Sequence, residues 1–200
     1  MSPMATLDAG LIKLLREQTG AGVMECKKAL EQSGGDKEEA LKILKARGAA
    51  IAAKKADRVA KEGVVDSYIH GGKIGVLVEV NCETDFVGRN EQFQTFVHDL
   101  GLQIAAMNPK YVSQEDVPSE LVEQEIHQLQ EMLVGAEGDQ FVSAQKSHME
   151  KFYQRLCLLD QLFVKDNSKT IQDLLTELIA STGENIVVRR FVRYQLGEGA

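Results

Sequence analysis

Two runs of alternating apolar and polar residues flank Gly71-Gly72, and they constrain the fold more than any other part of the chain. The second run, residues 74–80 (IGVLVEV), places every other apolar side chain on one side of an extended backbone. A period of two is typical of a half-buried strand, and a glycine pair between two such runs favours a two-residue hairpin turn. We therefore expect a β-hairpin with one face toward the core.

The first fifty residues have a helical period instead. Apolar residues recur three to four positions apart, and glycine-rich turns interrupt the pattern twice. Asp36 followed by Glu39 indicates a capping box at the start of a third helix, which we expect to end before Gly48. The prediction is a three-helix module over residues 1–55. So small a core is marginal alone, so we expect it to be tethered to a larger body and used for docking.

Residues 49–62 are alanine-rich and basic, which is typical of a solvated helical linker. Residues 1–62 carry 12 Lys and Arg against 9 Asp and Glu, whereas residues 63–200 carry 11 against 21. This change in charge indicates a domain boundary, with a linker at 56–63 and a core domain at 64–200. The basic residues could instead bind RNA, although the acidic remainder disfavours it.

The rest of the chain predicts helices that pack on a sheet. The expected elements are an amphipathic helix from Phe93 to Ile104, a helix after Ser119, a loop at 135–140, a helix to about Leu158, an extended piece at 162–164, a helix capped by Thr170 and Asp173, and a last strand from Ile186 to Leu196 that returns to the hairpin. This order gives an α+β fold with an antiparallel sheet.

Composition excludes several classes of protein. No apolar run approaches the roughly 18 residues of a membrane helix, and Met1–Gly10 lacks the pattern of a signal peptide. The three cysteines, Cys26, Cys82 and Cys157, are odd in number and far apart. They therefore indicate neither a disulfide framework nor a zinc site, and they fit a reducing cytoplasm.

Motifs of catalysis and cofactor binding are also missing. The chain has no phosphate-binding G-x-x-x-x-G-K-[ST], no H-E-x-x-H and no G-x-S-x-G, and its four histidines are scattered. Gly20-Ala21-Gly22 resembles the start of a dinucleotide fingerprint, but a helix precedes it and Glu25 replaces the third glycine. We expect no cofactor and no metal; an active site assembled from distant residues stays an alternative.

A large aromatic side chain stands directly after the hairpin, in polar and acidic surroundings. Phe86-Val87 follows Asp85 on a predicted loop, and loops carry function disproportionately. A projecting loop would offer an apolar wedge and a negative charge together, which suits prying another protein apart. The alternative is a helix start, with Asp85 or Asn90 as N-cap and Phe86 as a hydrophobic staple.

Two stretches resemble the signatures of a known family. Residues 15–30 (LREQTGAGVMECKKAL) and residues 78–90 (VEVNCETDFVGRN) are similar to the two signatures of elongation factor Ts, and residues 54–56, 157–161 and 190–193 extend the resemblance. The chain departs from the usual pattern at Val23-Met24-Glu25, at Gly88 in place of alanine, and at Leu162 in place of proline. The last departure leaves the conformation of the segment before Lys165 open.

The resemblance implies a guanine-nucleotide exchange factor that binds elongation factor Tu in its GDP form and expels the nucleotide. It implies an N-terminal module similar to ubiquitin-associated domains, a short single-core form that pairs into a homodimer and so gives a 2:2 complex, and a location in the bacterial cytoplasm, or in an organelle. No nucleic acid or membrane partner is implied. A rival interpretation is an adaptor that binds another helix without exchange activity.

The resemblance also implies which residues act. Asp85 and Phe86 would intrude on the magnesium site of the GTPase, Val87 would pack beside the ring, and Thr84 would hold the loop. The residues expected to dock the N-terminal module are Thr19, Gly20, Ala21, Gly22, Val23, Met24 and Lys27. Val23 and Met24 could instead be core residues of the second helix.

Overall fold

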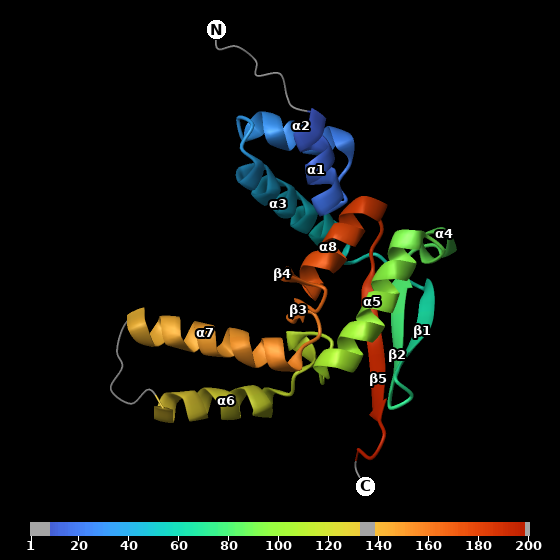
Figure 1. The fold of residues 1–200 in the computed structure, drawn as a ribbon. Helices are drawn as coiled ribbons and strands as arrows, with labels where there is room; N and C mark the ends of the chain where they lie inside the picture. Colours follow the sequence, from blue (N-terminus) through green and yellow to red (C-terminus); the bar gives the residue numbers. More distant parts are fainter. Residues whose placement is uncertain (1–8, 133–138, 199–200) are drawn as a thin grey trace. The chain divides into compact units, whose positions relative to one another are not determined.

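The computed structural model describes residues 9–132 and 139–198, which form eight α-helices, one 3-10 turn and five strands (Figure 1). The chain divides into two compact units. One comprises Met1–Val64, Val80–Phe96 and Asp173–Val187; the other comprises Val65–Glu79, Val97–Gln172 and Val188–Ala200. Helices and an antiparallel sheet occur in one chain, so the predicted α+β class is confirmed.

Three helices open the described chain, as the glycine-interrupted pattern predicts. They are α1 (Ala9–Thr19), α2 (Val23–Gln32) and α3 (Lys37–Lys55). Their shared core is fully apolar and consists of Leu15, Cys26, Ala29, Leu30, Ala40 and Leu44. Asp36 is the N-cap of α3, where its carboxylate accepts a 2.8 Å hydrogen bond from the Glu39 amide.

The third helix differs from the prediction, because it does not end before Gly48. It runs through this glycine to Lys55, and the chain then passes through a turn to β1, so the separate linker helix is absent from residues 56–61. Gly48 is buried: a Cβ there would lie 3.6 Å from Thr176 Cγ2 and 3.8 Å from Ala180 Cβ of α8 (Ile171–Thr182). Packing against α8 therefore lets the helix continue through Gly48, although glycine has a low helix propensity.

The predicted hairpin consists of β1 (Glu62–His70) and β2 (Ile74–Cys82), and β5 (Val187–Gln195) pairs with β2 to give the order β1-β2-β5. The Lys73 amide donates to the His70 carbonyl at 3.0 Å, which closes the turn. The side chains expected to face the core do so, with Ile74 partly buried and the others, Val76, Val78 and Val80, almost fully buried.

Helix α5 (Glu91–Met107) covers the inner face of the sheet. Its Gly101 approaches β1 so closely that an added Cβ would lie 2.9 Å from the Tyr68 Cβ. The helix buries the apolar residues that predicted it, including Phe93 and Leu100. The opposite face of the sheet leaves several apolar side chains exposed, namely Val65, Ile69, Leu77 and Tyr194.

The segment between α5 and β5 contains a helical pair and a small second sheet. The turn η1 (Gln114–Asp116) precedes α6 (Ser119–Met132) and α7 (Asp139–Leu156), which lie side by side in Figure 1. Strand β3 (Leu162–Phe163) then pairs antiparallel with β4 (Asp166–Thr170). The extended piece at Leu162 is thus confirmed without the proline, whereas β4 went unpredicted because its residues are polar.

Parts of the prediction fall outside the described residues, namely residues 1–8 of the predicted module and most of the loop at 135–140. Helix α7 begins at Asp139, inside that predicted loop, and ends at Leu156, two residues before the expected end. Among the described helices, none is both long and apolar enough to cross a membrane.

Replacing Gly48 with alanine should stabilise the protein. The added methyl makes ordinary contacts with α8 and removes backbone freedom from the unfolded chain, so we expect a gain of about 0.5–1 kcal/mol in the free energy of unfolding. Ala49→Gly, at the exposed next position, should cost about as much. Chemical denaturation of both variants measures this; a loss of stability in Gly48→Ala would contradict the prediction that the methyl group fits between α3 and α8.

Candidate functional site

The sequence signature after the hairpin folds into one helical turn, α4 (Asp85–Gly88). Thr84 is its N-cap, and its hydroxyl accepts a 3.4 Å hydrogen bond from the Val87 amide. The structure therefore combines the two expectations: the segment is a helix start, but Thr84 and not Asp85 caps it. We call residues 84–88 the tip.

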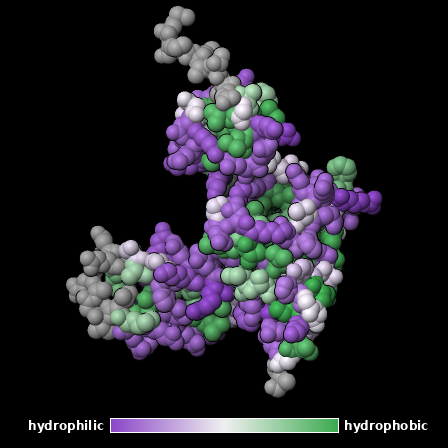
Figure 2. All heavy atoms as spheres, viewed as in Figure 1, coloured by the Kyte–Doolittle hydropathy of each residue, from purple (hydrophilic) through white to green (hydrophobic). Residues whose placement is uncertain are grey.

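Phe86 is the most exposed large apolar side chain of the described residues, with 79% of its surface accessible. It is therefore not a hydrophobic staple within this chain. Figure 2 shows apolar side chains that project beside hydrophilic ones at the place of α4 in Figure 1. The neighbouring Asp85 carboxylate lies 3.0 Å from the Arg89 guanidinium, and both side chains are mostly exposed. Such a pair contributes little stability, so the carboxylate is available to a partner.

The other half of the tip faces inward. Val87 is only 5% exposed, which differs from its expected place beside the Phe86 ring, and it anchors the tip to its own unit. Beneath it, the buried Cys82 thiol donates to the Thr84 carbonyl at 3.1 Å, and burial raises the pKa of this thiol. A methyl group at Gly88 would lie 3.6 Å from Cys82 Sγ, so the site also accommodates the alanine of the usual pattern.

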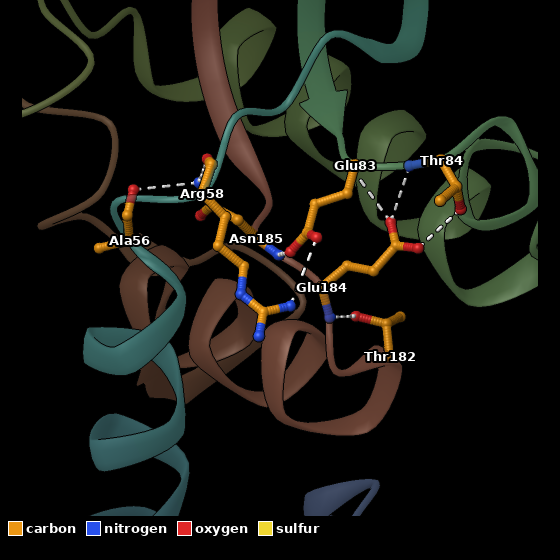
Figure 3. Close-up of polar contacts among 7 residues, drawn as sticks. All are labelled: Ala56, Arg58, Glu83, Thr84, Thr182, Glu184 and Asn185. Atoms are coloured by element: carbon orange, nitrogen blue, oxygen red, sulfur yellow. Dashed lines mark hydrogen bonds and ion pairs between the residues drawn. The ribbon is translucent and has the colours of Figure 1, made fainter.

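Glu184 and Asn185 bind the start of the tip, at Glu83 and Thr84 (Figure 3). The sequence did not predict a role for either residue. The Glu184 carboxylate accepts from the amides of Glu83 and Thr84, each at 3.1 Å, and from the Thr84 hydroxyl at 2.6 Å. In return, the Asn185 amide donates to the Glu83 carboxylate at 2.7 Å. This bond, together with the nearby Arg58 guanidinium, lowers the pKa of Glu83.

These contacts join residues about a hundred positions apart, so no local pattern reports them. The one sequence signal is their position: they follow Gly183, between the end of α8 and the start of β5. Polar residues in such a short connection are common in loops, and nothing in their spacing points to residues 83 and 84.

The edge formed by the end of α1 and the start of α2 contains the second group of predicted residues. Val23 and Met24 are 49% and 61% exposed, so they are not core residues. Thr19 is buried, donates to the Leu15 carbonyl at 2.7 Å, and accepts from the Ala21 amide at 3.3 Å. These bonds shape the turn through Gly20, Ala21 and Gly22 that presents the two apolar side chains, with Lys27 one turn further along α2.

The tip and the α1–α2 edge offer exposed apolar and charged side chains. In the part of the chain that the structure describes, no group of three or more His, Cys, Asp or Glu side chains is placed to hold a metal ion. The arrangement is suited to binding another macromolecule.

Comparison with known proteins adds independent information. The sequence profile of the family described as Elongation factor TS matches residues 11–198. Elongation factor Ts of Thermodesulfovibrio yellowstonii is 52% identical over 193 residues, covering 96% of this chain and 97% of the relative. The protein of the same name from Acetivibrio thermocellus is 55% identical over 194 residues, covering 96% and 90%.

Proposed function

The chain belongs to the elongation factor Ts family, and we propose that it is the guanine-nucleotide exchange factor that binds elongation factor Tu in its GDP form and promotes GDP release during translation elongation. The observation that carries this proposal is the tip: a largely exposed phenylalanine and a carboxylate on a capped, anchored turn. Aromatic side chains are enriched at protein–protein interfaces, which supports a binding role for this phenylalanine.

Exchange by this route follows from thermodynamic coupling. If the factor and GDP disfavour each other on the same GTPase, each weakens the binding of the other by an equal factor. Mg²⁺ and the backbone amides of the phosphate loop hold the nucleotide of such a GTPase. In the proposal, Phe86 enters the GTPase domain and Asp85 disturbs the polar network that orients the magnesium ligands.

The remaining tip residues have structural roles in this proposal. Thr84 caps the turn and Val87 anchors it, while burial of the Phe86 ring in the partner supplies about 1.5–3 kcal/mol. No covalent bond forms or breaks in this process, so the protein needs neither a catalytic constellation nor a cofactor of its own. We therefore regard it as a non-enzymatic factor.

Replacing Asp85 and Phe86 together with alanine should slow GDP release at saturating factor and leave folding nearly intact, because both side chains are exposed. Losing about 1.5 kcal/mol of ring burial corresponds to a roughly tenfold slower release. Stopped-flow fluorescence with labelled GDP measures the rate, and Met132→Ala, which removes another exposed apolar side chain, serves as control. An unchanged rate in the double variant would refute the wedge; a parent chain that binds without affecting release would be an adaptor.

The α1–α2 edge belongs to the proposed N-terminal docking module, residues 1–55. Val23 and Met24 supply exposed apolar surface. Lys27 supplies a positive charge, and about half of its side-chain surface is accessible. This module holds the GTPase while the tip acts on the nucleotide site, so binding and release are carried by different residues.

Changing Val23 and Met24 to serine should therefore weaken the complex roughly tenfold in calorimetry, because about 1.5 kcal/mol of apolar burial is lost. The release rate at saturating factor should stay close to that of the parent. An unaltered affinity, with Met132→Ser as reference, would reject docking by this edge.

We further propose a homodimer that presents two copies to two GTPase molecules. Its interface is the outer face of the sheet, where apolar side chains alternate with the buried ones and remain exposed on all three strands: Val65, Ile69, Leu77 and Tyr194. Apolar side chains exposed together on one face of a sheet favour an interaction surface there. The three cysteines are free and buried, so the proposed dimer is non-covalent and suits the reducing bacterial cytoplasm.

Ile69→Lys together with Tyr194→Lys should convert the proposed dimer to a monomer, because the interface would have to bury unpaired ammonium groups. Light scattering after gel filtration measures the mass. A parent chain that already elutes as a monomer at high concentration contradicts the dimer.

A further inference from the structure

We propose that Glu184 is a positioning residue for nucleotide exchange: it holds the tip in the orientation that presents Phe86 to the GTPase. This inference rests on the proposed exchange function and assigns a role to a residue outside both sequence signatures. It follows from the contacts drawn in Figure 3.

The Glu184 side chain makes three hydrogen bonds at the start of the tip, two to Thr84 and one to the residue before it. Oε2 of Glu184 accepts from two successive amides, those of Glu83 and Thr84, and Oε1 accepts from the Thr84 hydroxyl at 2.6 Å. An ionised acceptor makes such bonds shorter and stronger than neutral ones. Three of them fix the backbone and the side chain of Thr84 at once.

The Thr84 hydroxyl links Glu184 to the helix cap. Its single hydrogen points to Glu184, which leaves an oxygen lone pair for the Val87 amide at 3.4 Å. Glu184 thus sets the geometry of the helix cap through Thr84. A four-residue turn has too few internal hydrogen bonds to persist by itself, so its orientation depends on such outside contacts.

The backbone around Glu184 is itself fixed by hydrogen bonds. Its amide lies 3.4 Å from the Thr182 hydroxyl at the end of α8, and the amide of the next residue, Asn185, is bound by Glu83. The Asn185 side-chain amide donates to two carbonyls after α3, those of Ala56 at 3.1 Å and Arg58 at 2.7 Å. The backbone that carries the Glu184 carboxylate is therefore held in place.

Orientation matters more than stability in this arrangement. Val87 and Cys82 are buried and anchor the inner half of the tip, so we expect the fold to survive the loss of the Glu184 carboxylate. A tip that samples several orientations must be ordered when it binds, and that cost reduces the free energy left for displacing GDP. Glu184 removes this cost in advance.

The test uses Glu184→Gln in the full chain. Glutamine is neutral and has one acceptor oxygen. If that oxygen keeps the two backbone amides, its NH₂ group donates to the Thr84 hydroxyl oxygen, which reverses this bond and turns the hydroxyl hydrogen away from residue 184. We expect roughly tenfold slower GDP release at saturating factor, with little change in thermal stability or in the concentration for half-maximal effect. Hydrogen exchange at the amides of residues 83, 84 and 87 should accelerate, which a merely global loss of stability would not do selectively.

Three further variants complete the design. Glu123→Gln makes the same chemical change at an exposed position in α6, outside the docking module and the tip, and should match the parent. Thr84→Val removes only the hydroxyl and should slow release even if Glu184→Gln does not fold. Because Glu184 acts through the exposed residues of the tip, adding Glu184→Gln to the Asp85→Ala, Phe86→Ala variant should slow release no further.

The outcomes separate the two proposals. A parent chain that fails to accelerate GDP release overturns the exchange function itself. A parent chain that accelerates release, together with Glu184→Gln and Thr84→Val variants that match it, overturns the positioning role alone. Independent effects of Glu184→Gln and of the Asp85→Ala, Phe86→Ala change, which multiply in the combined variant, overturn it as well.

Discussion

A carboxylate that accepts three hydrogen bonds at the start of a four-residue helix is the interaction on which the candidate site depends. Glu184 binds the Thr84 hydroxyl, and the same hydroxyl receives the Val87 amide. Val87 is buried while Phe86, one residue earlier, is largely exposed. The protein thus buries Val87 and exposes Phe86. An apolar wedge requires this combination, because its backbone must be fixed while its aromatic ring stays accessible to a partner.

Much of the fold was predictable because the signals are local and strong. Alternating residues around Gly71-Gly72 gave the hairpin, and Asp36 before an apolar period gave the start of α3. The exposed ring of Phe86 was also expected, since a large aromatic in acidic surroundings has no core to join. The family followed from two long signatures that the profile match over residues 11–198 confirms.

Long-range contacts account for what the sequence did not reveal. Gly48 lies inside α3 because it packs on Thr176, which is far along the chain. The polar strand β4 exists because β3 pairs with it, and Glu184 reaches Thr84 across 100 positions. Propensity and period report only neighbours in sequence, so contacts of this kind require the folded structure.

The central claim is that the Phe86 ring enters the GTPase beside its nucleotide. A photo-crosslinking phenylalanine analogue at position 86 tests this directly in a mixture with elongation factor Tu, followed by mass spectrometry of the crosslinked peptides. The account predicts crosslinks to the GTPase domain near the phosphate-binding loop, and a lower yield when GDP is in excess. Crosslinks confined to the factor itself, or to a partner surface remote from the nucleotide, would contradict it.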